Sequence, residues 1–184
     1  MKLLQILPIG NVNEGRLKEL LPALEETFGV RSQVLPVRLD PEFAFHDERQ
    51  QYHSSEILRR MQGFLTADSW RMLAIADVDL YIPILTFVFG EAQVGGPCAV
   101  VSAHRLHQEF YGFPANAELL RQRLEKEAIH ELGHTLSLTH CDDYRCVMAS
   151  SHAVEWIDLK DSSLCVACRT AAMPKTRVHS AQRD

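Results

Sequence analysis

Residues 117–141, AELLRQRLEKEAIHELGHTLSLTHC, decide the fold because they join a long helix to a cluster of histidines. The segment from Ala117 to about Ser137 is rich in strong helix formers, and its apolar residues recur at helical spacing. The pattern HExxH occupies residues 130–134, inside this predicted helix. We therefore expect a long helix that packs on a core through one face and carries its chemistry near its C-terminal end.

The HExxH pattern predicts a zinc site with a catalytic base. His130 and His134 are four residues apart, so they lie on one face of a helix and can bind one ion. Glu131 is rotated by about a quarter turn, which keeps its carboxylate outside the coordination shell but close to a water on the metal. Five-residue matches of this kind also arise by chance on helix surfaces, so a third ligand is needed to support the prediction.

His140 is the candidate for the third ligand of the catalytic zinc. A helix that continued to His140 would place it about 9 Å further along the axis than His134 and on another face. The helix must therefore end, and the chain must turn near Ser137. A residue other than glycine in the left-handed backbone region costs on the order of 1–2 kcal/mol, which metal binding can offset.

Four of the five cysteines lie within residues 141–168, as Cys141, Cys146 and the CxxC pair Cys165 and Cys168. Two such pairs suit a tetrahedral zinc site of four thiolates, which is closed to water and therefore structural. Two disulfides or four free thiols are the alternatives. We read no export signal at the N-terminus, and this disfavours disulfides.

The segment 130–168 resembles the archaemetzincin family of zinc metallopeptidases. The pattern of that family is HExxHxxGxxHC, followed by a further cysteine, CxM and a distal CxxC. The chain reproduces every element except the glycine, which is Ser137 here, and Met148 matches the methionine turn beneath the metzincin zinc. The segments RQQY at 49–52 and FVFGEAQVGG at 87–96 are also similar to that family.

The resemblance implies a metzincin-like α/β (α+β) fold. It would have a mixed twisted sheet packed on helices, a long active-site helix and a small C-terminal part stapled by the second zinc. It also implies that a strand at 98–102 borders the cleft and pairs with an extended peptide, with Cys98 as a small buried residue. Aminopeptidase activity is attributed to some members of the family, so it is one activity to expect.

The residues ahead of the long helix alternate short apolar runs with amphipathic helices, which by itself predicts an α/β sheet. The elements expected are strands at 2–7, 33–38, 72–75, 85–89 and 98–102, helices at 14–28, at 54–65 with Ser54 or Ser55 as its cap, and near 166–173, and a loop at 40–51.

The 184 residues, 46% of them apolar, are enough for one cored domain and too few for two. We expect one metallopeptidase domain over 1–184, with an N-terminal subdomain over about 1–137, a C-terminal subdomain over about 138–174 and a polar tail at 175–184. The net charge of −5 provides no broad basic surface for nucleic acid. No stretch approaches the roughly 18 apolar residues of a membrane span, so we expect a cytoplasmic protein, with a monomer favoured.

The predicted function is zinc-dependent hydrolysis of peptide or protein substrates, with one catalytic and one structural zinc per chain. Glu131 would take a proton from the attacking water and pass it to the leaving amine. The alternative is a non-catalytic or latent zinc-binding protein that uses the same scaffold to bind a partner. Glu131 weighs against this alternative, because a structural three-histidine site needs no base. Ser137 weighs for it, because a displaced His140 would spoil the open coordination position.

Several other polar residues receive no role from the sequence. No tyrosine close behind Met148 offers an oxyanion stabiliser, and Tyr144 lies between two of the cysteines. Glu91 and Arg105 are candidates to line a cleft near the expected edge strand, but we favour the interpretation of both as solvated charges.

Overall fold

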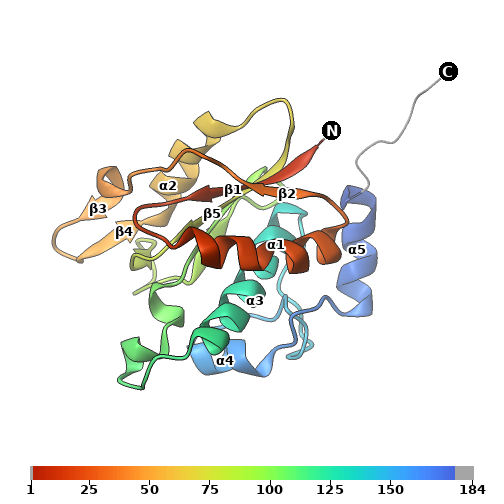
Figure 1. Cartoon of the computed structure of the whole chain (residues 1–184). Coiled ribbons are helices and arrows are strands. Elements are labelled where there is room, and N and C mark those ends of the chain that lie inside the picture. The colour runs from red at the N-terminus through yellow and green to blue at the C-terminus, as the bar shows by residue number, and fades with distance from the viewer. Residues whose placement is uncertain (1, 177–184) are drawn as a thin grey trace.

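A computed structural model describes residues 2–176 and shows a five-stranded sheet with helices on both faces (Figure 1). The strand order is β2-β1-β5-β8-β7, in which β7 is antiparallel to β8 and the other neighbours are parallel. The expected mixed α/β architecture is therefore confirmed. The strands of this sheet are β1 (Leu3–Pro8), β2 (Ser32–Val34), β5 (Ser69–Ala76), β7 (Gly90–Ala92) and β8 (Cys98–Ser102).

A second, smaller sheet lies beside the first and contains three very short strands in the order β3-β4-β6. β3 (Phe45–His46) and β4 (Gln51–His53) form a hairpin, and β6 (Leu80–Tyr81) pairs parallel to β4. The loop that follows β6 leads from this small sheet to β7 of the main sheet.

Two helical layers bury the two faces of the main sheet. α1 (Glu14–Phe28) and α3 (Ala117–Thr135) pack side by side against one face, and α2 (Ser54–Met61) covers the other (Figure 1). Alternate residues of β5 serve the two layers, because side chains along a strand point to opposite faces. Leu73 and Ile75 join the core under α1 and α3, whereas Met72 and Ala74 join the core under α2.

Helix α3 is fixed at both ends. The side chain of Asn116 caps its N-terminus by accepting a hydrogen bond from Leu119 N at 3.0 Å. At the C-terminus, Arg71 of β5 donates to Thr135 Oγ1 at 3.2 Å and to Thr135 O at 3.3 Å. The orphan carbonyls of the last turn are thus partly satisfied by the sheet, which sets the position of the HExxH segment against it.

The C-terminal part contains α4 (Val154–Leu159) and α5 (Val166–Thr176). The helix α4 was not expected from the sequence, because six residues give too short a periodic pattern to recognise. Arg123 of α3 holds it through two 2.7 Å hydrogen bonds to Asp158. Ile157 is fully buried, whereas Trp156 is 52% exposed.

Most of the expected elements are present, with shifted bounds, and one strand is wrong. Residues 85–89 form a loop, and the strand in this region is β7. The carbonyls of Leu85 and Thr86 accept hydrogen bonds from the side chains of Arg49 and Gln51 instead of from a neighbouring strand. The loop expected at 40–51 contains a 3-10 turn (Glu42–Ala44), β3 and the first residue of β4, and the strand expected at 33–38 shortens to β2.

The cap predicted for α2 is also wrong. The N-cap residue is His53, and it makes no capping hydrogen bond through its side chain. The hydroxyls of Ser54 and Ser55 donate to Glu91 instead, at 2.5 and 2.8 Å. A partner that is distant in the sequence therefore outcompetes the local backbone for these two hydroxyls.

Three further predictions concern membrane-spanning helices, the division into subdomains and the C-terminal tail. Among residues 2–176, no helix is long and apolar enough to cross a membrane. The division into subdomains near residue 137 stays a prediction. The polar tail was placed at 175–184, but α5 continues to Thr176, and residues 177–184 lie outside the described part of the chain.

Candidate active site

The structure brings the three predicted histidine ligands together. One ring nitrogen from each of His130, His134 and His140 lies within 4.8 Å of the others. The Nε2 atoms of His130 and His134 are 3.1 Å apart, which is the consequence of their spacing on one face of α3. The first two histidines are buried or half-buried, and His140 is exposed on the loop that follows the helix.

The backbone fixes which nitrogen of two of these histidines faces the shared point. His130 Nδ1 donates to Val147 O, and His134 Nδ1 donates to Leu138 O, both at 2.8 Å. This leaves the Nε2 lone pairs directed at one another, as they are in histidines that bind a metal. Burial lowers the pKa of all three histidines, most strongly at His130, and so favours the neutral imidazole that a metal requires. The residues therefore fit a zinc ion.

The turn that returns His140 to the other two histidines has the expected geometry. Ser137 adopts φ = 63°, in the left-handed region, as predicted. Its N–H donates to His134 O at 2.8 Å, and Leu138 N–H donates to Gly133 O at 3.1 Å. The helix thus ends in a left-handed cap at Ser137, and the chain reverses toward His130 and His134.

Met148 lies directly beneath the HExxH turn. It is fully buried, and a Cβ atom built on Gly133 would lie only 2.4 Å from its sulfur atom. A larger residue in this turn of α3 would therefore force the side chain of Met148 to shift. Met148 O also accepts a hydrogen bond from Cys141 N at 3.0 Å, which links the turn to the residue after His140.

Glu131 is buried between α3 and the edge strand β7. It is 6% exposed, and a Cβ atom on Gly90 would lie 2.7 Å from Glu131 Cγ, so only glycine leaves room for this carboxyl group. Burial raises the pKa of Glu131 well above its usual range, and the charges of Glu127 and Glu91 raise it further.

A cavity of about 370 Å³ opens onto His130, His140 and Glu131. One wall comes from the loop ahead of β7, and a second wall comes from residues 150–152, which follow Met148. Ser151 Oγ in this second wall is buried and has no hydrogen-bond partner among the described residues. The lining residues are Leu85, Thr86, Phe87, Val88, Phe89, Gly90, Glu127, His130, Glu131, His140, Ser150, Ser151 and His152.

Glu127 is a residue of the site that the sequence reading missed. It lies one helical turn before Glu131, and this i, i+4 spacing on the same face is the signal that could have identified it. Glu127 is 3% exposed and pairs with the buried Lys160 at 3.4 Å. Lys160 also donates to Val147 O at 3.3 Å, the same carbonyl that accepts from His130. This ion pair therefore connects α3 with the segment that orients the first histidine.

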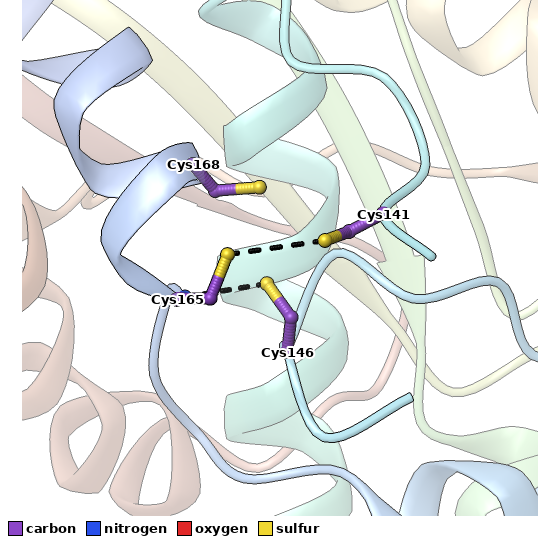
Figure 2. Close-up of side chains that lie close together, drawn as sticks. All are labelled: Cys141, Cys146, Cys165 and Cys168. Carbon is purple, nitrogen blue, oxygen red and sulfur yellow. Dashed lines mark hydrogen bonds between the residues drawn. The ribbon is translucent and has the colours of Figure 1, made fainter. Parts of the chain in front are cut away.

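The four cysteines form a second cluster behind the site. Figure 2 shows their thiols turned toward one another, two from the segment after α3 and two from the start of α5. Their sulfur atoms lie within 4.8 Å of one another, and those of Cys141 and Cys165 are 3.8 Å apart. No disulfide joins them. A hydrogen bond from the backbone of Cys168 lowers the pKa of Cys165 to about 7, whereas burial raises the pKa of Cys141 and of Cys168.

The prediction that Arg105 and Glu91 are solvated charges is wrong, because both side chains have defined partners. Arg105 forms a bidentate ion pair with Asp79, at 2.5 and 2.7 Å. Glu91 accepts hydrogen bonds from the hydroxyls of Ser54 and Ser55, as described above. Cys98 is fully buried in the sheet, as expected, but β8 pairs with both β5 and β7, so the prediction that it pairs with a substrate peptide is wrong.

Comparison with known proteins relates this geometry to a family. The profile of Peptidase family M54 matches residues 30–173. The archaemetzincin of Methanocaldococcus jannaschii is 42% identical over 163 residues, which cover 89% of this chain and 88% of that relative. The archaemetzincin of Thermococcus kodakarensis is 37% identical over 180 residues, which cover 91% of this chain and 94% of that relative.

Solved structures show the same fold. The crystal structure of archaemetzincin from Archaeoglobus fulgidus in complex with malonate matches with a TM-score of 0.79 at 36% identity, covering 93% of this chain and 99% of that one. A zinc-dependent peptidase from Methanocorpusculum labreanum matches with a TM-score of 0.82 at 28% identity, covering 92% and 99%. These matches confirm the metzincin-like fold and favour an enzyme over a non-catalytic zinc protein. The chain therefore belongs to Peptidase family M54, the archaemetzincins, and is a zinc metallopeptidase.

Proposed function

We propose that Glu131 is the general base of peptide hydrolysis at a zinc ion held by His130, His134 and His140. The observation that carries this proposal is that Glu131 lines the same cavity as His130 and His140. When bound, zinc supplies a Lewis acid that lowers the pKa of a water molecule and polarises the scissile carbonyl. Glu131 takes one proton from the attacking water and returns it to the leaving amine.

The surroundings of Glu131 support this role. The burial that raises its pKa makes the carboxylate a stronger base than a solvated glutamate would be. Gly90 leaves space for the carboxyl group without covering it by a side chain of its own. The cavity holds a neutral hydroxyl in Ser151 that has no partner among the described residues, so it is a candidate donor to the developing oxyanion.

The experiment is the substitution Glu131→Gln, which keeps the shape of the side chain and removes the base. We expect turnover of a peptide substrate to fall by about 10²–10⁴-fold, the usual contribution of a general base, with the zinc content unchanged. Glu118→Gln is the matched control, because Glu118 is exposed in the first turn of the same helix and pairs only with nearby side chains. Turnover retained in Glu131→Gln would exclude this role.

The proposal includes a second, structural zinc at Cys141, Cys146, Cys165 and Cys168. Four converging sulfur atoms match the tetrahedral set that zinc prefers, and such a set leaves no position for substrate. The complete protein would then carry two zinc ions, one at each cluster. A cytoplasmic location and a monomeric state stay predictions from the sequence.

The proposal also extends to aminopeptidase activity, the finer specificity suggested by the family. This specificity rests on the resemblance to the family, because the carboxylate of Glu127 in the cavity pairs with Lys160 and that of Glu91 accepts from Ser54 and Ser55. Comparing one peptide with its N-acetylated form tests this point: an aminopeptidase cleaves only the free form, and equal rates would mean an endopeptidase.

A further inference from the structure

One wall of the active-site cleft is a loop with little backbone support of its own. Residues 85–89 line the cavity, between β6 and β7. Leu85 N–H bonds to Ile82 O within the loop, and Val88 N–H bonds to Leu80 O through an isolated bridge. Phe89 O accepts a hydrogen bond from Ser102 N of β8 at 2.8 Å, which ties the end of the loop to the main sheet, whereas the position of Leu85, Thr86 and Phe87 depends on other contacts.

Side chains from the β3–β4 hairpin supply those contacts. Arg49 Nη2 donates to Leu85 O at 2.8 Å and to Thr86 O at 3.1 Å. Gln51 Nε2 donates to the same Thr86 O at 2.9 Å. Arg49 Nε also donates to Gln51 Oε1 at 3.0 Å, so the two residues act as one unit. They belong to the RQQY segment that the sequence singled out without a role.

The two clamping side chains are themselves held in place. Gln51 is 6% exposed, and its Nε2 also donates to Asp79 Oδ2 at 3.0 Å. The guanidinium of Arg49 lies over the ring of Tyr81, 4.2 Å from its centroid. Gln50, between them, adopts φ = 54°, an unfavourable conformation for this residue that the surrounding contacts must offset.

The same network reaches the wall from a second direction. Asp79 pairs with Arg105, and the guanidinium of Arg105 lies 4.2 Å from the ring centroid of Phe87 in the wall. Arg49 and Gln51 thus hold the backbone of the loop, while Arg105 holds one of its aromatic side chains. Two charged side chains and one amide side chain thus fix a loop whose cavity-lining residues are mainly apolar.

The composition of the wall indicates what it contacts. Leu85, Phe87, Val88 and Phe89 are apolar, whereas a second part of the lining is formed by Ser150, Ser151 and His152. Burying an apolar substrate side chain against an apolar wall makes the binding free energy more favourable, provided that the wall stays in place. The cavity therefore has one face suited to an apolar side chain and one suited to polar parts of the peptide.

We propose that Arg49 and Gln51 are positioning residues that hold the 85–89 wall, and that this wall selects peptides with a large apolar side chain beside the scissile bond. The inference rests on the proposed function of the cleft. Neither residue lines the cavity or contacts the histidines, so both act through the loop.

The experiment compares wild type with Arg49→Ala on two peptides that differ only in having leucine or glycine beside the cleaved bond. We expect KM for the leucine peptide to rise about tenfold in Arg49→Ala, with kcat and zinc content nearly unchanged, because one apolar contact is worth about this much discrimination. The constants for the glycine peptide should hardly change. Arg49→Lys keeps a donor to the carbonyls and should restore part of the effect.

Arg60→Ala is the matched control. Arg60 also lies over an aromatic ring, 4.3 Å from the centroid of Phe43, but it is on α2 and makes no contact with the wall. We expect both peptides to be cleaved by Arg60→Ala as by wild type. Unchanged selectivity in Arg49→Ala would overturn the proposal, and so would an equal loss for both peptides together with loss of zinc.

Hydrogen–deuterium exchange gives a readout that does not depend on turnover. The amides of residues 82–89 should exchange faster in Arg49→Ala and in Gln51→Leu than in wild type, while those of α3 keep their protection. Unchanged exchange in the wall would overturn the positioning role. Failure of the proposed function would look different: wild type would cleave neither peptide, while the exchange rates would still report whether Arg49 holds the wall.

Discussion

The histidine cluster and the cysteine cluster are adjacent in sequence, but different kinds of contact hold their side chains in place. The histidines are oriented from outside, by carbonyls of Val147 and Leu138, and one side of the cluster opens to a cavity of about 370 Å³. The cysteine sulfur atoms mainly contact one another and the backbone of their own segment (Figure 2). Three metal-binding side chains that are oriented by neighbouring carbonyls can leave one coordination position open for water or substrate. Four thiols that converge on one point leave no such position.

The difference also concerns which part of the fold depends on the metal. Two of the three histidines are carried by α3, which is anchored to the sheet by Arg71 and packed on a large core. The segment from Cys141 to Cys168 contains one short helix, α4, and only the first residues of α5, so we expect its fold to depend on whatever joins the sulfur atoms. We therefore expect loss of the cysteine site to affect stability and loss of the histidine site to affect catalysis.

The largest expected effect on stability is that of Cys146→Ser. Cys146 is 2% exposed, and its replacement would remove one ligand and leave a hydroxyl in an apolar place. We expect the free energy of unfolding of the zinc-loaded protein to fall by about 3–5 kcal/mol, part of the binding energy of a structural zinc. Urea denaturation with and without a chelator measures this change.

Cys98→Ser is the control for that substitution. Cys98 is fully buried as well, but it lies in β8, away from the cluster. Its replacement should lower the free energy of unfolding by about 1–3 kcal/mol, the cost of a buried hydroxyl, whether or not a chelator is present. If the chelator has no effect on wild type either, the cysteines do not hold a stabilising metal.

A smaller effect is expected at Ser137, where the family pattern has glycine. Ser137→Gly removes the penalty for φ = 63° but adds flexibility to the unfolded chain. The two terms nearly offset, so we expect a gain of up to about 1 kcal/mol in the free energy of unfolding, with turnover unchanged. Thermal denaturation and peptide hydrolysis measure the two quantities. A loss of turnover would mean that the serine side chain itself supports the site.

The sequence predicted the chemistry of the site better than its shape. The HExxH spacing on a helix brought His130 and His134 together by local geometry, and a required reversal predicted the left-handed turn at Ser137. The long elements also followed from periodicity, and α1 (Glu14–Phe28) has the predicted bounds. Local rules of this kind act over a few residues and need no knowledge of the tertiary structure.

The cleft wall could not be predicted in the same way. Residues 85–89 have the apolar composition of a strand, but their carbonyls bind Arg49 and Gln51, more than 30 residues earlier in the chain. The hydroxyls expected to cap α2 likewise turned to Glu91, a distant carboxylate. In both cases a contact between distant segments replaced the local preference.

Zinc content shows whether the two clusters hold two zinc ions with different roles. Zinc per chain should be measured in wild type, in His134→Ala and in Cys146→Ser, together with peptide hydrolysis. We expect two ions in wild type and one in each variant, with hydrolysis lost in His134→Ala and stability retained there. Two ions in His134→Ala, or wild-type hydrolysis in that variant, would mean that the histidines do not hold a catalytic zinc.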